Sequence, residues 1–220
     1  MKKKTVYQLI IDRSGSMSGM EKQVVSGYNE QLQAAQAVQK QFPDQDIILG
    51  VRFFDSCVGD NLFDFKNVNE LQAMPDSAYK TGSSTALLDA IGKSIFDIKT
   101  KFGFQIENMD TTVVVIIITD GYENTSKVYT YNDIRRMITE LEQTEKWNFT
   151  FMGADLDAIA ASASFGIKSE NSISFDKSDY AQVAKEYFKK AAFNMSEAKS
   201  RNEKPSDFFS IFRNKDIRKK

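Results

Sequence analysis

The sequence contains no histidine among its 220 residues. This absence excludes a Ser-His-Asp or Cys-His nucleophile system built from this chain alone. It also excludes zinc sites that depend on histidine. Any functional site must therefore use carboxylates, hydroxyls, lysines, arginines, tyrosines and the backbone.

Cysteine is nearly absent as well, since Cys57 is the single one. No disulfide can form within the chain, which suits a reducing compartment, and we expect a cytoplasmic location. The charged start at residues 2–4 is followed by an apolar run that is too short for a signal peptide and ends in Asp12. No apolar run is long enough to span a membrane, since the most apolar one, residues 113–118, has the length of a strand.

The chain also has no large excess of charge of either sign. The net charge is −1, so no overall attraction to nucleic acid is expected. Hydrophobic residues make up 41% of the chain and charged residues 27%, which is typical of a soluble globular protein. The length fits one α/β domain, or one domain with an appendage.

Apolar runs and helical periodicities alternate along the chain. Short apolar runs predict strands at 5–11, 47–54, 58–65, 112–118, 147–152 and 172–175. Apolar residues at helical spacing predict helices at 21–40, 87–98, 131–145, 155–165 and 179–198. This order predicts an α/β fold: a Rossmann-like, doubly wound, mostly parallel sheet with helices on both faces. The short link at 55–57 predicts a hairpin, so strand 58–65 should be an antiparallel edge strand.

The same pattern predicts a single domain over residues 1–201, followed by a tail at 202–220. The tail combines aromatic residues with a basic end, from Arg213 to Lys220. One interpretation is a segment that folds back or frays. The other is a short docking segment for a partner.

The first predicted strand ends in Asp12-Arg13-Ser14-Gly15-Ser16. In an open parallel sheet, ligands bind at the loops that follow the carboxyl ends of the strands. One carboxylate and two hydroxyls, at alternating positions, therefore stand where a site is expected. Carboxylate and hydroxyl oxygens are hard ligands that suit Mg²⁺. Taken alone, the cluster is equally well interpreted as a turn whose side chains bond their own backbone.

Two further segments carry oxygen ligands. The loop 81–85 precedes a predicted helix and ends in Thr85, and Thr119-Asp120-Gly121 ends the strand 112–118. All three loops can converge at one edge of a doubly wound sheet. Thr81, Ser83 and Ser84 are alternative hydroxyl ligands in the second loop.

Together these residues resemble the metal-ion-dependent adhesion site of von Willebrand factor type A domains. That family's pattern is Asp-x-Ser-x-Ser, then a Thr, then an Asp in a Thr-Asp-Gly-like turn. Here the pattern corresponds to residues 12–16, Thr85 and Asp120. The resemblance covers about residues 5–175, and the combination of the three segments is specific although each one alone is not.

The resemblance implies a role for each residue. Ser14 and Ser16 would coordinate a metal ion directly, and Thr85 directly or through water. Asp12 and Asp120 would act through water or by hydrogen-bonding the other ligands. Neutral hydroxyls leave a cation electrophilic, so one of its waters can be exchanged for the carboxylate of a partner. We expect Mg²⁺, with Mn²⁺ and Ca²⁺ as alternatives.

Several nearby polar residues have less certain roles. Asp89, one turn into the predicted helix, either braces the second loop or is an acid favoured by the helix dipole. Glu123, Asn124 and Asp155 are further candidates for the rim of the site.

The resemblance favours a metal-dependent protein-interaction module that binds a Glu or Asp of a partner. We expect an intracellular adaptor or subunit, with complexes of AAA-type ATPases among its possible settings, and not an enzyme. The alternatives are a Mg²⁺-dependent hydrolase or phosphoryl-transfer enzyme, and a structural domain with a vestigial site. Against an enzyme, the sequence shows no general base with an evident partner and no phosphate-binding Gly-x-x-x-x-Gly-Lys-Ser/Thr loop. A dinucleotide-binding domain is disfavoured because Gly-x-Gly-x-x-Gly is missing from the first loop.

Overall fold

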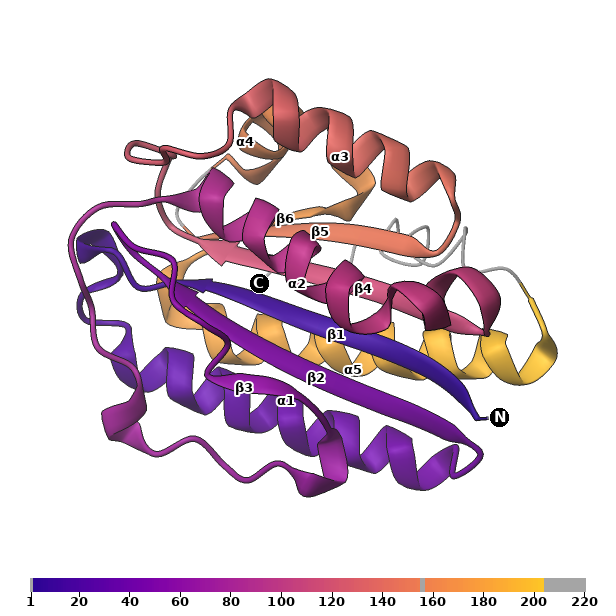
Figure 1. Cartoon of the computed structure of the whole chain (residues 1–220). Coiled ribbons are helices and arrows are strands. Elements are labelled where there is room, and N and C mark those ends of the chain that lie inside the picture. Colours follow the sequence, from indigo (N-terminus) through magenta and orange to yellow (C-terminus); the bar gives the residue numbers. More distant parts are fainter. Residues whose placement is uncertain (1, 155–156, 204–220) are drawn as a thin grey trace.

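The computed structural model describes residues 2–154 and 157–203. One sheet is covered by helices on both of its faces (Figure 1). The strands are β1 (Lys3–Asp12), β2 (Gln45–Phe54), β3 (Phe63–Asn67), β4 (Thr111–Thr119), β5 (Trp147–Ala154) and β6 (Ser172–Phe175). The α-helices are α1 (Glu21–Gln41), α2 (Leu87–Asn108), α3 (Tyr131–Gln143), α4 (Ala158–Ser164) and α5 (Tyr180–Arg201).

The six strands are ordered β3-β2-β1-β4-β5-β6. All neighbours are parallel except β3, which pairs antiparallel with β2 at the edge. The predicted fold class is therefore confirmed. The chain leaves β1 toward β2 on one side and returns to β4 on the other, so the switch point lies between β1 and β4. Ile11 and Ile118 are register partners, which places the carboxyl ends of these two strands side by side.

Each face of the sheet packs against its own layer of helices (Figure 1). Leu9 and Ile116 belong to the core shared with α1 and α5, whereas Ile10 and Ile117 belong to the core shared with α2 and α3. This alternation follows from the strand geometry, which sends successive side chains to opposite faces. All nine residues of β4 are buried, as expected for a β-branched central strand.

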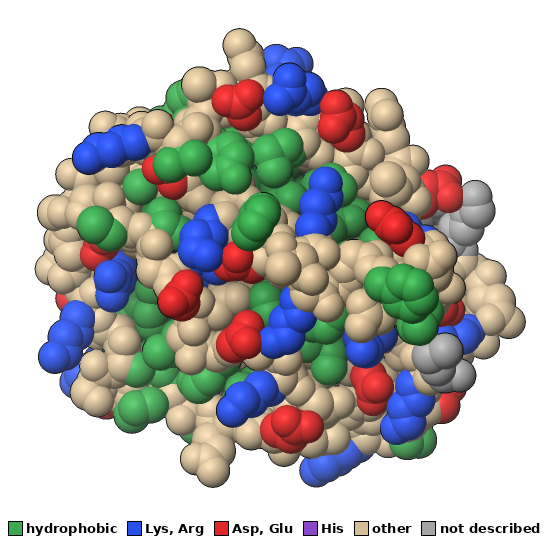
Figure 2. Space-filling view, in the orientation of Figure 1, with side chains coloured by type: hydrophobic (Ala, Val, Ile, Leu, Met, Phe, Trp, Pro, Cys, Tyr) green, Lys and Arg blue, Asp and Glu red, His purple; other side chains and the backbone are tan. Residues whose placement is uncertain are grey.

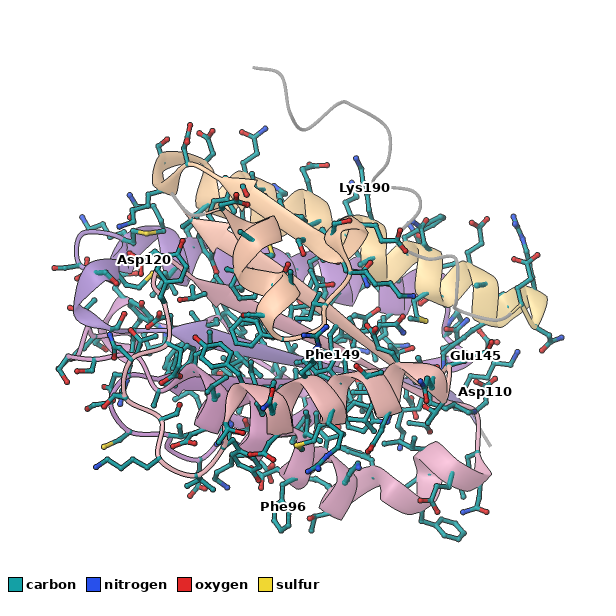
Figure 3. The ribbon with its side chains drawn as sticks, turned by 90° about the horizontal axis from the view of Figure 1, so that it is seen from above. Phe96, Asp110, Asp120, Glu145, Phe149 and Lys190 are labelled. Carbon is teal, nitrogen blue, oxygen red and sulfur yellow. The ribbon has the colours of Figure 1, made fainter. Side chains whose placement is uncertain are left out.

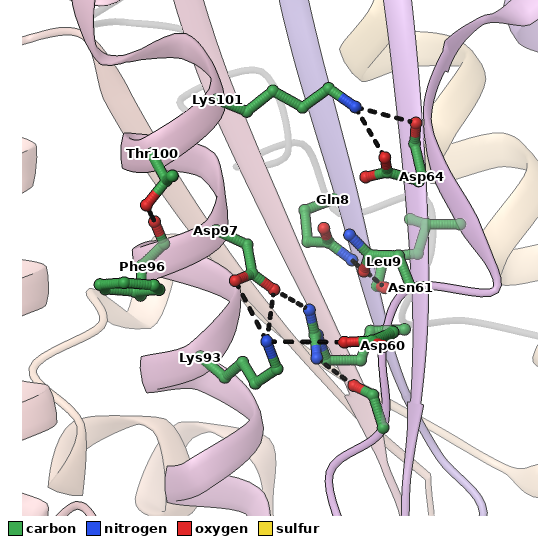
Figure 4. A network of polar contacts seen from close by, with 12 residues as sticks. Gln8, Leu9, Asp60, Asn61, Asp64, Lys93, Phe96, Asp97, Thr100 and Lys101 are labelled. Atoms are coloured by element: carbon green, nitrogen blue, oxygen red, sulfur yellow. Dashed lines mark hydrogen bonds and ion pairs between the residues drawn. The ribbon is translucent and has the colours of Figure 1, made fainter.

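The edge strand differs from its prediction. We expected a strand at 58–65, but β3 begins at Phe63, and Val58 makes only an isolated bridge to Phe54. The residues between them turn toward buried polar groups. The Gly59 carbonyl accepts a hydrogen bond from the Arg52 guanidinium, and the Asn61 side chain accepts one from Gln8 (Figure 4).

Arg52 is the centre of a charged cluster between the β2–β3 loop and α2. Its side chain is fully buried and forms an ion pair with Asp97 of α2. The ammonium of Lys93 lies 3.0 Å from Oδ2 of Asp97 and 3.8 Å from Oδ1 of Asp60. Burial lowers the pKa of Arg52, and the Asp97 carboxylate opposes that change. These contacts hold the loop before β3 against α2.

The helix boundaries follow local backbone conformation. Helix α3 ends at Gln143, two residues before the predicted end, and Glu145 has a left-handed φ of 57°. Helix α5 continues to Arg201 and is closed by Asn202, which is also left-handed at 56°. The predicted helix 155–165 corresponds to α4, and Asp155, a candidate for the rim of the site, lies outside the described residues. Most of the tail at 202–220 lies outside them too.

The surface over α2 carries charged side chains of both signs with apolar side chains between them (Figure 2). Phe96 and Phe104 of this helix are 61% and 67% exposed. Within residues 2–154 and 157–203, none of the helices combines the length and the apolar character needed to cross a membrane.

Candidate metal site

Asp12 connects the ends of the two central strands. Its buried carboxylate accepts a hydrogen bond from the Ser14 backbone N–H at 2.7 Å through Oδ1. It accepts another from the Thr119 hydroxyl at 2.6 Å through Oδ2. Burial raises the pKa of Asp12, while the hydrogen bonds from Thr119 and Ser14 lower it. The Tyr79 hydroxyl also donates to the Asp12 carbonyl at 2.5 Å. Both the backbone and the carboxylate of this residue are therefore held in one orientation.

Ser14, Ser16 and Asp120 form a row of oxygen atoms beside Asp12. The Ser14 and Ser16 hydroxyls lie 3.1 Å apart, and the Ser16 hydroxyl donates to Asp120 Oδ1 at 2.6 Å. Ser14 is buried and Ser16 is exposed, so the row meets the surface at Ser16, between two covered side chains. Figure 3 places Asp120 at one end of the molecule, with Asp110 and Glu145 at the other.

Gly121 shows where the three loops converge. A Cβ atom added to this glycine would lie 3.5 Å from Ser16 Oγ, 3.5 Å from Thr85 Oγ1 and 3.9 Å from Asp12 Oδ2. One point in front of the backbone that follows β4 is therefore surrounded by donor oxygens from the end of β1 and its loop and from Thr85, just before α2. Because glycine has no side chain, this space stays open. Hydroxyl and carboxylate oxygens fit a hard divalent cation there.

Thr85 is the second-loop hydroxyl that lies beside this space. Thr81 instead donates to Glu21 at 3.5 Å, and Ser83 pairs with Ser56 at 3.1 Å. The structure thus brings the proposed residues of all three loops together. That they bind a metal ion stays a prediction.

Backbone hydrogen bonds hold the first and second loops against each other. The Gly15 N–H donates to the Ser83 carbonyl at 2.8 Å, and the Gly82 N–H donates to the Arg13 carbonyl at 2.6 Å. The Arg13 side chain forms an ion pair with Asp55 at 3.0 Å. These contacts fix the relative position of the two loops without using the side chains of the proposed metal ligands.

The remaining polar candidates support the loop that follows Gly121. Asp89 accepts hydrogen bonds from three successive backbone N–H groups, those of residues 127–129, at 2.8–2.9 Å. Glu123 accepts the Leu88 N–H at 2.9 Å, near the start of α2. Asn124 accepts the Thr85 N–H at 2.9 Å. Asp89 thus braces the third loop, and Asn124 orients the backbone of Thr85.

Lys177 is a further residue of the site that no sequence motif indicates. This residue begins a short 3₁₀ helix (Lys177–Asp179) between β6 and α5. Its ammonium lies 2.7 Å from Asp120 Oδ2 and donates to the Ser16 carbonyl at 3.1 Å. No motif surrounds it in the sequence. Its position just after a predicted parallel strand was the available signal, because that edge of the sheet is where the site lies.

The donor set contains few carboxylates. Across the described part of the chain, no group of three or more His, Cys, Asp or Glu side chains is placed to hold a metal ion. Asp12 and Asp120 supply two carboxylates, so a cation bound here would depend on the hydroxyls for its remaining protein ligands.

Comparison with known proteins adds structural similarity at low sequence identity. No family model matches the chain, and no curated protein matches it either. Among solved structures, proximal thread matrix protein 1 from the mussel byssus is 13% identical, with a TM-score of 0.57 over 87% of this chain and 47% of that one. A von Willebrand factor type A protein from Catenulispora acidiphila is 14% identical, with a TM-score of 0.59 over 87% and 43%. The vWF domain of the pilus tip protein Mfa5 from Porphyromonas gingivalis is 9% identical, with a TM-score of 0.56 over 86% and 95%.

The chain spans less than half the length of the first two of these proteins. A further structure of the mussel protein has a zinc-occupied MIDAS motif, and it is 14% identical, with a TM-score of 0.55 over 87% and 46%. At such identities the similarity establishes the fold, and the function has to be argued from the site.

Proposed function

We propose that this chain, which has the fold of a von Willebrand factor type A domain, is a metal-dependent protein-interaction module. It binds a divalent cation through Asp12, Ser14, Ser16, Thr85 and Asp120, and it recognises a Glu or Asp side chain of a partner protein. The observation that carries the proposal is the space in front of Gly121, a residue of the third loop, which donor oxygens of the first and second loops surround.

In this proposal, the residues of the site have different roles. Ser14 and Ser16, linked by their hydroxyls, offer neutral oxygens. Asp12 is held by Thr119 and by the Ser14 backbone, so its carboxylate is oriented before any ion arrives. A bound cation would supply an electrophilic centre that takes a carboxylate oxygen of the partner in place of water. The exposure of Ser16 leaves one side of the site accessible to such a partner.

Mg²⁺ is the proposed ion because it prefers oxygen ligands and retains several waters. Mn²⁺ and Ca²⁺ are the alternatives, and zinc is the ion named for the mussel protein. The location in the cytoplasm, the adaptor role and a complex with an AAA-type ATPase stay predictions from the sequence. The absence of enzymatic activity also stays a prediction.

Calorimetric titration of Mg²⁺ and Mn²⁺ into the metal-free protein tests the proposal. Thr85→Val removes one proposed ligand at nearly constant volume, and Ser83→Ala is the matched control in the same loop. We expect saturable binding that Thr85→Val weakens at least tenfold, or by about 1.4 kcal/mol, and that Ser83→Ala leaves unchanged. Acetate should bind the metal-loaded protein and not the metal-free one. Failure of both ions to bind, with and without acetate, would refute the proposal.

A further inference from the structure

Lys177 places a positive charge against the proposed metal site. Its ammonium contacts Oδ2 of Asp120, while Oδ1 accepts a hydrogen bond from the Ser16 hydroxyl. It also donates to the Ser16 backbone carbonyl. A single carboxylate therefore lies between the ammonium and a proposed ligand. Lys177 comes from the segment that enters α5, which contributes no residue to the motif.

The formal charges near the site show what this lysine changes. Asp12 and Asp120 together carry two negative charges, which a divalent cation would neutralise. The neighbouring Arg13 and Asp55 form an ion pair and cancel each other. Lys177 adds one positive charge beside these two carboxylates, and an incoming carboxylate would be attracted to it.

Exposure determines which of these charges a partner meets. The Asp120 side chain is fully covered, whereas 34% of the Lys177 side chain is accessible. An approaching anion would therefore meet the partly exposed Lys177 side chain, and it would meet the acid only through the bound ion. At a partly covered surface, charges a few ångströms apart interact by several kcal/mol at most, and solvent reduces this further.

We propose that Lys177 sets the anion preference of the metal site: its charge weakens the binding of the cation and strengthens the binding of the carboxylate. The inference rests on the proposed function and deepens it, because it assigns part of the recognition of an acidic partner to a residue outside the motif. Lys177 acts through Asp120 and through the electrostatic potential at the mouth of the site. A purely structural role would have no reason to change the two affinities in opposite directions.

The test measures both affinities in the whole protein. Mn²⁺ binding is measured from the loss of the free-ion signal in electron paramagnetic resonance. Acetate binding to the Mn²⁺-loaded protein is measured by calorimetry. Lys177→Met removes the charge and keeps much of the side-chain volume, whereas Lys177→Arg keeps the charge. Lys190→Met, on the exposed side of α5 and well away from Asp120 in Figure 3, removes one positive charge elsewhere.

For Lys177→Met we expect Mn²⁺ to bind about tenfold more tightly and acetate about tenfold more weakly, each change equivalent to about 1.4 kcal/mol. Lys177→Arg and Lys190→Met should change neither constant by more than about twofold, or about 0.4 kcal/mol. Changes of both constants in the same direction, or no change, would overturn the inference while leaving the metal site intact. Absence of Mn²⁺ binding in the unsubstituted protein would refute the proposed function itself, and this inference with it. Thermal unfolding of each metal-free variant identifies any variant that fails to fold, and in that event Lys177→Gln replaces Lys177→Met.

Discussion

Replacing Gly121 with alanine tests the site with a single added methyl group. The new carbon would lie 3.5 Å from Ser16 Oγ and Thr85 Oγ1, which is ordinary van der Waals contact. Gly121 is not among the residues with positive φ, so alanine fits its backbone. The metal-free fold should therefore keep its stability to within about 1 kcal/mol. The space enclosed by the three oxygens would, however, be occupied.

Mg²⁺ requires oxygen ligands at about 2.1 Å and retains several waters, so the methyl group would displace at least one water or ligand. We expect metal affinity to fall at least tenfold, or by about 1.4 kcal/mol. Calorimetry gives the affinity, and chemical denaturation of the metal-free protein gives the stability. The reasoning would be refuted by unchanged metal binding in a folded variant, because the ion would then lie outside this space. A large loss of stability would show that the space is packed and not open.

Three further predictions concern stability. Gly103→Ala should stabilise the protein by about 0.5–1 kcal/mol, because this position of α2 has nothing within 4 Å and alanine favours helix. Gly92→Ala, in the same helix, should destabilise it by about 1–3 kcal/mol, because its Cβ would lie 2.4 Å from the Tyr129 ring; denaturant unfolding of the two variants should give changes of opposite sign. Asp97→Ala should cost about 3 kcal/mol and more than Arg52→Met, because it leaves a buried guanidinium without its ion-pair partner, whereas Asp97 without Arg52 still has Lys93. Equal losses in thermal unfolding would contradict this. Burial lowers the pKa of Lys199 from 10.5 to about 8, so the unfolded chain binds more protons than the folded one between these values and stability should rise with pH from about 8 to 10. At about 1.4 kcal/mol for each tenfold change in proton affinity, the free energy of unfolding should rise by about 3 kcal/mol in all. Lys199→Met should lose this rise. The explanation would be ruled out if the variant kept the same pH dependence.

The fold was predictable from sequence because its central elements obey simple patterns. Strand β4 is buried throughout and is an unbroken β-branched run. Strand β3 was predicted less well because its start depends on Arg52, whose buried guanidinium is bonded to Gly59 and Asp97. A buried arginine in an apolar strand has no periodic signal. Its partner on α2 is distant in sequence, so the position of the loop could not be inferred locally.

The candidate site was likewise predictable from the sequence only in part. Asp12, Ser14, Ser16, Thr85 and Asp120 were predicted as one constellation because each lies at the end or entrance of a regular element and because together they resemble a known motif. Lys177 was not, because its role depends on where the β6–α5 connection crosses the sheet edge. The supporting hydrogen bonds of Asp89 and Asn124 also depend on the path of the loop that follows Gly121. A motif predicts which oxygens could be ligands, and the three-dimensional packing determines which charges surround them.

The hydrogen bond between Ser16 and Asp120 joins residues 104 positions apart in the sequence. Neither residue can meet the other until β1 and β4 have paired at the centre of the sheet. A partly folded chain would therefore have no complete site, and a cation would bind almost exclusively to the finished domain. Binding of that kind stabilises the native state by mass action. Under this proposal, the concentration of free divalent metal would act as a control on how long the folded protein survives, independently of any partner.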